Sequence, residues 1–236
     1  MKLDYKIVVT GGSGRFGSIL QKKYKSNKLL YPNKKRLNIL SAESIEKYLK
    51  KTKPKILIHL AGLSRPMKMH SEDIIKSIDL NIIGTANIVK ICSKLRIKLI
   101  YFSTSYVYQG KKGNYRETDP VLPFNNYAWS KMGGECSVQM YKNSLILRCC
   151  MTEKPFLHKR ALANVKANFI FQDEIADIIF KIINKKGILN IGGKIQTIYN
   201  FAKKYANVKK SFLKKGFPKN PSMNIKEFKK IIKNNY

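Results

Sequence analysis

A glycine-rich segment near the N-terminus most constrains what this chain can fold into. An apolar run, IVVT, leads into GGSGRFG at residues 11–17, and a helical spacing of apolar residues follows at once. Glycine permits a tight strand-to-helix turn and a close approach of the backbone to a pyrophosphate, which the helix N-terminus attracts. Two registers fit, one starting at Gly11 and one at Gly12. The segment predicts a dinucleotide-binding turn, with an ordinary glycine turn as the alternative.

Apolar patterns along the rest of the chain alternate between strand and helix. Strands are expected at 29–31, 55–60, 99–103, 145–148, 169–171 and 187–191. Helices are expected at about 15–25, after Ser41 as N-cap, at about 72–94, 126–141, 173–183 and 197–205, and at 224–234 with Ser222 as cap. This alternation predicts an α/β fold, a Rossmann-type doubly wound parallel sheet with right-handed crossovers.

Composition excludes several classes of protein. The 236 residues are 44% hydrophobic and 26% charged, which is typical of a globular chain. No apolar run approaches the roughly 20 residues of a membrane span, so no membrane partner is expected. The N-terminus passes directly into the first strand, which leaves no room for a signal peptide. We therefore expect a cytoplasmic protein.

The charge balance is strongly basic, with a formal net charge of +33. Such a surface could bind nucleic acid. However, 40 of the 47 basic residues are lysines spread along the chain, whereas base-reading proteins favour the arginine fork. We expect no specific nucleic-acid partner, although the positive field would attract anionic cofactors and substrates.

The four cysteines show no metal-ligand spacing. Cys92, Cys136, Cys149 and Cys150 form no CxxC pair and have no histidine cluster beside them. We interpret them as reduced packing residues and expect no metal site. His59, inside a predicted strand, is interpreted as a structural residue with a hydrogen-bonded ring.

The end of the second strand bears on cofactor choice. An acidic residue there would accept hydrogen bonds from the ribose of NAD, but this chain has Lys34, Lys35 and Arg36 instead. Cations suit a 2′-phosphate. We therefore expect NADP, with NAD as the alternative.

A tyrosine and a lysine begin the helix expected at 126–141. Tyr127 and Lys131 are four residues apart, so a helix places them on one face, where the ammonium can lower the pKa of the phenol. Tyr-x-x-x-Lys occurs six times in the chain, so the spacing alone carries little weight. Only this copy begins a helix after a strand-end hydroxyl cluster at 103–105. Context favours Tyr127 as a proton donor.

The ordered motifs resemble a known family. The stretches are TGGSGRFG at 10–17, HLAG at 59–62, NIIGTAN at 81–87, FSTSYVY at 102–108, YRETDP at 115–120 and PFNNYAWSKMGGE at 123–135. Together they resemble the extended short-chain dehydrogenases/reductases that act on nucleotide-activated sugars, most closely the dTDP-4-dehydrorhamnose reductase branch. The resemblance covers residues 6–148 and extends to NIGG at 190–193 and NPSMN at 220–224.

The resemblance implies a role for each matching residue. Thr104 would hold the keto or hydroxyl oxygen, with Ser105 as the alternative, Tyr127 would be the general acid/base, and Lys131 would lower its pKa and bind the nicotinamide ribose. Asn81 matches a helix asparagine near the active site or has a structural role. The implied cofactor contacts are Gly11, Gly12, Ser13, Gly14, Arg15, Phe16, Asn38, Ile39, Leu60, Ala61, Gly62 and Lys131.

Two departures from the family concern its ligands. Asn38 replaces the usual aspartate near the adenine, and only 20 residues separate Arg148 from Phe169, where relatives carry part of the sugar-nucleotide site. Residues 158–160 could contact a diphosphate or form solvated surface. We expect an NAD(P)-binding domain at 1–150, with Tyr127 and Lys131, and a reduced substrate-binding lobe at 151–236 interwoven with it.

The expected function is an NADP-dependent reductase of a nucleotide-activated 4-keto-deoxy sugar, in surface-polysaccharide biosynthesis. An epimerase or dehydratase on the same scaffold is the alternative, although Ser105 stands where dehydratases usually have an acidic residue. A non-catalytic NADP-binding regulatory subunit is a third reading. Since the family often dimerises through the helix with Tyr127 and its neighbour, a homodimer is a further expectation.

Overall fold

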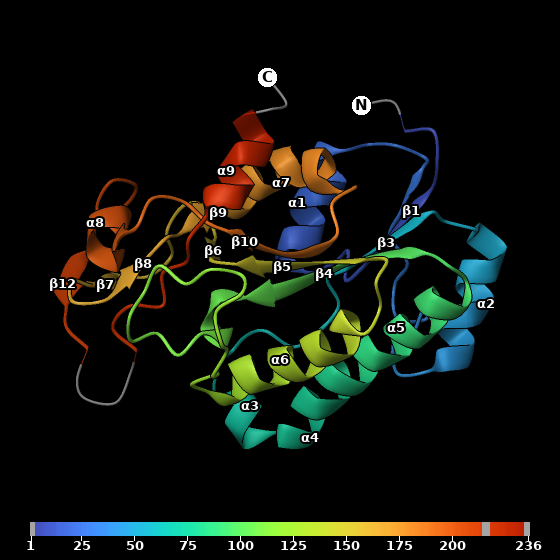
Figure 1. Ribbon diagram of the computed structural model, residues 1–236, viewed down its shortest axis with the longest axis horizontal. Helices are drawn as coiled ribbons and strands as arrows, with labels where there is room; N and C mark the ends of the chain where they lie inside the picture. The colour runs from blue at the N-terminus through green and yellow to red at the C-terminus, as the bar shows by residue number, and fades with distance from the viewer. Residues whose placement is uncertain (1–2, 214–217, 234–236) are drawn as a thin grey trace. The chain divides into compact units, whose positions relative to one another are not determined.

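The computed structural model describes residues 3–213 and 218–233, drawn as a ribbon in Figure 1. Its strands are β1 (Ile7–Thr10), β2 (Leu29–Leu30), β3 (Ile56–His59), β4 (Lys98–Thr104), β5 (Ser144–Cys149), β6 (Met151–Thr152), β7 (Arg160–Leu162), β8 (Lys166–Ala167), β9 (Ile170–Phe171), β10 (Gly187–Ile191), β11 (Gln196–Thr197) and β12 (Lys209–Ser211). Its helices are α1 (Arg15–Lys23), α2 (Ala42–Thr52), α3 (Met69–Glu72), α4 (Ile74–Ile78), α5 (Gly84–Lys94), α6 (Asn126–Gln139), α7 (Gln172–Ile182), α8 (Ile198–Ala202) and α9 (Lys226–Lys233), with a π turn at Asp79–Ile83 and a 3₁₀ turn at Ser105–Val107.

The central sheet has six strands in the order β10-β5-β4-β3-β1-β2. Strand β1 pairs in parallel with β2 and β3, and β3 pairs in parallel with β4. Every residue of β1, β3 and β4 is buried, as their near-continuous apolar runs predict for strands covered on both faces. Helix α1 lies on one face of these strands, and α2, α5 and α6 lie on the other (Figure 1). The predicted Rossmann-type doubly wound α/β fold is confirmed.

The chain forms two compact units. Unit 1 comprises Met1–Phe102, Trp129–Ile146 and Lys185–Gly187, and unit 2 comprises Ser103–Ala128, Leu147–Asn184 and Ile188–Tyr236. Strands β4, β5 and β10 begin in unit 1 and end in unit 2, so the chain passes repeatedly from one unit to the other.

The single helix expected at about 72–94 is wrong in one respect, because it is interrupted. Asp73 caps α4 by accepting a hydrogen bond from the backbone N–H of Lys76 at 2.9 Å. Residues 79–83 then wind as a π turn before α5 begins. A π turn adds one residue within an otherwise helical pattern and leaves most of the apolar spacing intact. The sequence pattern therefore located the helical segment correctly but did not predict the interruption within it.

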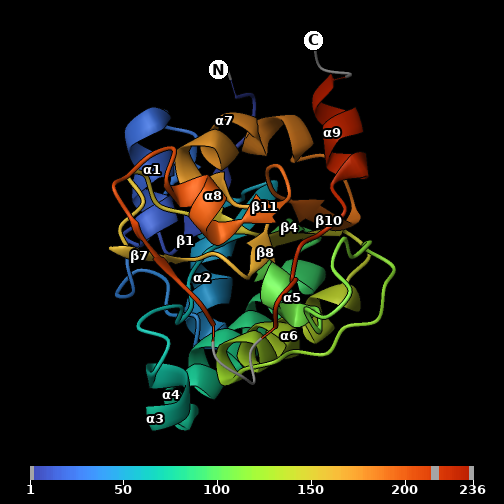
Figure 2. The same cartoon turned by 90° about the vertical axis from the view of Figure 1, so that its left-hand side faces the viewer.

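Unit 2 is built from shorter elements. Helix α7 lies beside α9 in both views (Figures 1 and 2). Two-stranded sheets join β8 to β11, β7 to β12 and β6 to β9. A cluster that includes Phe156, Phe171 and Phe201 forms an aromatic core. Helix α8 ends at Ala202, three residues before the expected end.

The expected cap of the last helix is wrong. Asn224, not Ser222, accepts the hydrogen bond from the backbone N–H of Lys226, at 2.9 Å. The Ser222 hydroxyl instead accepts from the backbone N–H of Asn114 and donates to the side chain of Asn220. Helix α9 is described up to Lys233, and the expected end at Asn234 lies outside the described residues.

Two adjacent glycines on α6 should differ in how much stability they lose on substitution by alanine. A Cβ at Gly134 would lie 2.7 Å from the Tyr101 hydroxyl and against the backbone oxygen of Asn81, whereas one at Gly133 would meet only side-chain atoms of Ile82, its Cδ1 at 2.8 Å and its Cγ1 at 2.9 Å. We expect Gly134→Ala to lower the free energy of unfolding by about 1–3 kcal/mol through overpacking. Gly133→Ala should change it by less than about 1 kcal/mol, since the helix propensity gained offsets the contact. Urea unfolding measures both, and equal losses would contradict the packing described.

Candidate functional site

The glycine turn between β1 and α1 adopts the register that starts at Gly11. Gly11 has φ +70°, and a Cβ there would lie 2.6 Å from the backbone nitrogen of Ala61. Its carbonyl accepts the backbone N–H of Gly14 at 2.9 Å, and a Cβ at Gly17 would meet the Cα of Gly12 at 2.8 Å. Because Gly14 caps α1 without a side-chain bond, the first N–H groups of the helix are left for an anion.

A buried chain of hydrogen bonds runs behind this turn. The hydroxyl oxygen of Thr10 lies 2.8 Å from Nδ1 of His59, and Nε2 of His59 lies 3.2 Å from the hydroxyl of Thr85. Thr10 also accepts the backbone N–H groups of Leu60 and Ala61, at 3.2 and 3.3 Å. The Thr10 proton is therefore directed at Nδ1, which makes His59 the neutral Nε2–H tautomer. The interpretation of His59 as a structural residue with a hydrogen-bonded ring is confirmed.

Asn81 holds the segment that follows β3. Its side-chain oxygen accepts the backbone N–H of Leu63 at 2.7 Å, and its Nδ2 donates to the carbonyl of Leu63 and to the hydroxyl of Ser130, both at 2.8 Å. Arg15 adds a bond to the Ser64 hydroxyl at 2.8 Å. Asn81 lies in the π turn and is buried, so it positions the backbone around Gly62 and the first turns of α6.

Lys131 lies on α6, immediately after Ser130. Its Nζ is 4.1 Å from the ring centroid of the buried Tyr101, whose hydroxyl donates to the backbone oxygen of Lys131 at 3.0 Å. The hydrogen bond holds the backbone of Lys131, and the cation–π contact holds its ammonium group. Tyr101, a strand residue without a motif of its own, gave no signal of this role in the sequence.

Thr104 is the last residue of β4 and is buried in unit 2. Its hydroxyl oxygen accepts the backbone N–H of Tyr106 at 3.2 Å, which occupies a lone pair and not the hydroxyl proton. The neighbouring Ser105 hydroxyl bonds the thiol of Cys150, whose pKa burial raises to about 11. Thr104 ends the strand and Ser105 begins the 3₁₀ turn, and their hydroxyl groups have different partners.

Tyr127 lies in the first turn of α6 and is half buried. The Tyr106 ring meets it edge-on, with centroids 6.3 Å apart, and Phe124 packs on the same Tyr106 ring at 4.9 Å. Tyr127 precedes Lys131 by four residues on one continuous helix, so both side chains belong to one helical face.

The residues expected near the adenine line the loop between β2 and α2. The side-chain oxygen of Asn38 accepts a hydrogen bond from the backbone N–H of Leu40 at 3.2 Å within this loop, and Ile39 is buried. Lys35 and Arg36 are exposed and line a cavity of about 610 Å³, together with lysines of α2. Phe16 packs its ring on Phe102 with centroids 5.0 Å apart, so only its backbone is available to a ligand.

Other parts of unit 2 are held by a buried cation. Arg148 donates to the hydroxyl of Tyr108 at 2.8 Å and to the carbonyl of Glu117 at 3.2 Å, and Tyr108 donates to the side-chain oxygen of Asn190 at 2.9 Å. This network ties the long loop after β4 to β5 and β10.

Residues 158–160, which could contact a diphosphate or form solvated surface, are exposed. Among the cysteines, Cys92, Cys149 and Cys150 are buried and Cys136 is exposed.

Across the described residues, no helix has the length and apolar character needed to cross a membrane. The fold and the glycine turn define a Rossmann-type α/β protein of the extended short-chain dehydrogenase/reductase kind. A model of the RmlD substrate binding domain matches residues 5–152, and the chain belongs to this family.

Solved structures and curated proteins agree with this assignment of fold. The dTDP-4-dehydrorhamnose reductase of Bacillus anthracis, solved with NADP, superposes with a TM-score of 0.85 at 21% identity and covers 96% of this chain and 92% of its own. The Xenopus laevis methionine adenosyltransferase 2 subunit beta is 29% identical over 61% of this chain and 46% of its own length. The dTDP-D-glucose 4,6-dehydratase of Dictyostelium discoideum is 30% identical over 62% and 42%. The chain thus spans less than half the length of the curated relatives it matches.

The buried His59 should make stability depend on pH. Burial, with the Lys131 ammonium as a smaller cause, lowers the pKa of His59 from 6.5 to about 3. Between these values the unfolded chain binds a proton that the folded protein excludes, so stability falls as pH falls, by up to about 1.4 kcal/mol per pH unit. We expect His59→Asn to lessen this slope between pH 6.5 and 5, measured by urea unfolding. An unchanged slope would contradict a neutral buried imidazole.

Proposed function

We propose that this chain is an NADP-dependent reductase of a nucleotide-linked 4-keto-deoxy sugar. The observation that carries the proposal is the pair of groups on α6, where Tyr127 and a positioned Lys131 share one helical face. The family match and the reductase from Bacillus anthracis, with its NADP, support the same reaction class. The nucleotide sugar is the expected partner of this site, in surface-polysaccharide biosynthesis.

The cofactor fits the residues present. A Cβ would fill the cradle at Gly11 and Gly17, and the first turn of α1 offers N–H groups to a pyrophosphate. We assign the cofactor contacts to residues 11–16, Asn38, Ile39, residues 60–62 and Lys131. NADPH, when bound, supplies the hydride that the keto carbon accepts.

The chain's own residues handle the proton and the oxygen. Tyr127 donates its phenolic proton to the keto oxygen as the alcohol forms, and the Lys131 ammonium favours the resulting phenolate. Thr104 donates a hydrogen bond to the same oxygen, since the bond that it accepts from the N–H of Tyr106 leaves its hydroxyl proton available. An epimerase or dehydratase would use the same three residues with a different oxidation sequence.

A second candidate is a cofactor-binding regulatory subunit without turnover. Several curated relatives are methionine adenosyltransferase 2 beta subunits, at 26–30% identity over 141–153 residues. In such a role the chain would bind NADP and a partner enzyme, and Tyr127 would have no task.

Tyr127→Phe separates these two functions. We expect it to lower NADPH consumption with nucleotide-linked 4-keto sugars by at least about 10²-fold, because the proton donor is lost, and to leave the Kd for NADPH within two-fold. Absorbance of the reduced cofactor follows turnover, and Tyr199→Phe, from another Tyr-x-x-x-Lys copy, is the matched control. Equal turnover in both variants would contradict the assignment of Tyr127.

Cofactor choice has its own test. If Lys35 and Arg36 bind the 2′-phosphate, Lys35→Glu/Arg36→Glu should weaken NADPH at least ten-fold and leave NADH within two-fold, because NADH lacks that phosphate. Fluorescence titration of the two cofactors measures both affinities in one protein. Parallel losses for the two cofactors would contradict this site for the phosphate.

We infer that unit 1 also carries a homodimer face. Ile74, Ile75, Ile78 and Ile83, on α4 and the π turn, are 40–74% exposed and form an apolar ridge. Ile75→Glu/Ile78→Glu should convert a dimer to a monomer in sedimentation velocity, whereas Leu157→Glu, at an exposed leucine of unit 2, should not. A wild-type monomer at high micromolar concentration would exclude the dimer.

A further inference from the structure

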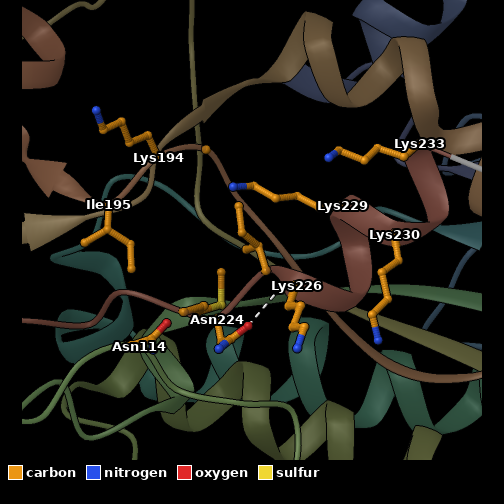
Figure 3. A pocket seen from close by; sticks show the side chains of 11 residues that line it. Asn114, Lys194, Ile195, Asn224, Lys226, Lys229, Lys230 and Lys233 are labelled. Carbon is orange, nitrogen blue, oxygen red and sulfur yellow. Dashed lines mark hydrogen bonds between the residues drawn. The ribbon is translucent and has the colours of Figure 1, made fainter.

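A second cavity with a cationic wall lies entirely in unit 2. Its volume is about 570 Å³, within the range of small-ligand sites, and Figure 3 shows it from close by. It is lined by Asn114, Gly193, Lys194, Ile195, Met223, Asn224, Ile225, Lys226, Lys229, Lys230 and Lys233. None of these residues belongs to the glycine turn, to β4 or to α6, so the cavity lies apart from every group assigned to the reductase reaction.

The lining is far more cationic than the chain as a whole. Five of its eleven residues are lysines and none is acidic, whereas lysines make up 40 of the 236 residues overall. Lys230 pairs with Glu227 at 2.8 Å. Within the described part of the chain, no carboxylate oxygen lies within 4.0 Å of Lys194, Lys229 or Lys233. These three ammonium groups therefore have no anionic partner there.

The spacing of the lysines on α9 makes the absence of counter-charge costly. Lys229 and Lys233 are four residues apart and extend to the same side of the helix in Figure 3, whereas Lys226 and Lys230, at the same spacing, have Glu227 as a counter-charge. Like charges at this spacing destabilise a helix. An anion held between them would remove that repulsion, so binding and the stability of α9 are coupled.

The floor of the cavity is apolar and fixed in place. Ile225 is buried, Met223 has no exposed surface, and Ile195 is 38% exposed. The fully buried Asn168 holds Met223 by two hydrogen bonds, accepting its N–H at 3.1 Å and donating to its carbonyl at 3.2 Å. Asn114, which also lines the cavity, offers an amide of the kind that hydrogen-bonds a base.

An apolar floor beside several ammonium groups suits a ligand with a flat ring at one end and adjacent phosphates at the other. We propose that this cavity binds a nucleoside di- or triphosphate, with the phosphates on Lys194, Lys229 and Lys233 and the base against Ile195 and Ile225. The site is independent of the proposed reductase function and is separate from the dinucleotide turn.

The test uses the full chain saturated with NADP, so that the dinucleotide turn is occupied. Isothermal titration with AMP, ADP, ATP, adenosine and inorganic triphosphate is compared among the wild type, Lys229→Glu/Lys233→Glu, and a matched control. The control is Lys22→Glu/Lys25→Glu, which changes two lysines of another cavity of about 570 Å³ in unit 1. Circular dichroism establishes that each variant is folded.

We expect affinity to rise from AMP to ADP to ATP, and the double variant on α9 to weaken ATP at least ten-fold while the control stays within two-fold. ATP should also raise the melting temperature of the wild type and not that of the α9 variant. Equal losses of ATP affinity in the two variants would mean that net charge alone governs binding, which would overturn the proposal. Triphosphate binding as tightly as ATP, or single-stranded RNA displacing ATP at lower concentration, would overturn it as well.

Discussion

The rest of the structure depends on a small set of buried hydrogen bonds around Thr10 and His59. Thr10 ends β1 and His59 ends β3, and the bond between their side chains joins two neighbouring strands at their carboxyl edge. The same hydroxyl holds the backbone of Leu60 and Ala61 against the glycine turn. A buried donor or acceptor left without a partner would cost about 1–3 kcal/mol, so this edge has one favourable arrangement.

Further contacts fix the segments that flank this edge of the sheet. Gly11 fits against Ala61 only because it lacks a side chain, and Asn81 fixes the following residues and reaches Ser130 on α6. Lys131 is therefore placed by its neighbours before any ligand arrives. Such preorganisation is what acid/base chemistry requires, because groups that are already oriented need not be ordered during the reaction.

Much of this could be predicted from the sequence. Buried parallel strands gave near-continuous apolar runs, and the glycine segment specified a strand, a turn and a helix. Of the six Tyr-x-x-x-Lys copies, all within residues 3–213, the one at 127 and 131 lies inside a helix from end to end.

The π turn could not be predicted, since it adds one residue to a helical pattern. Nor could the cap at Asn224, because Ser222 and Asn224 are both good caps and tertiary bonds to Asn114 decided between them. Strands of two or three residues, such as β8 and β11, are too short for any periodicity.

We propose that the carboxyl edge of β1 and β3 forms a dinucleotide site before any ligand binds. Amide NMR of the ¹⁵N-labelled chain during an NADPH titration tests it directly. We predict that the signals of residues 12–15 and 60–62 shift together and saturate with one equivalent, while His59 keeps the ¹⁵N signature of a neutral Nε2–H ring throughout. Saturable shifts confined to other residues, or a protonated His59 at pH 7, would contradict the account.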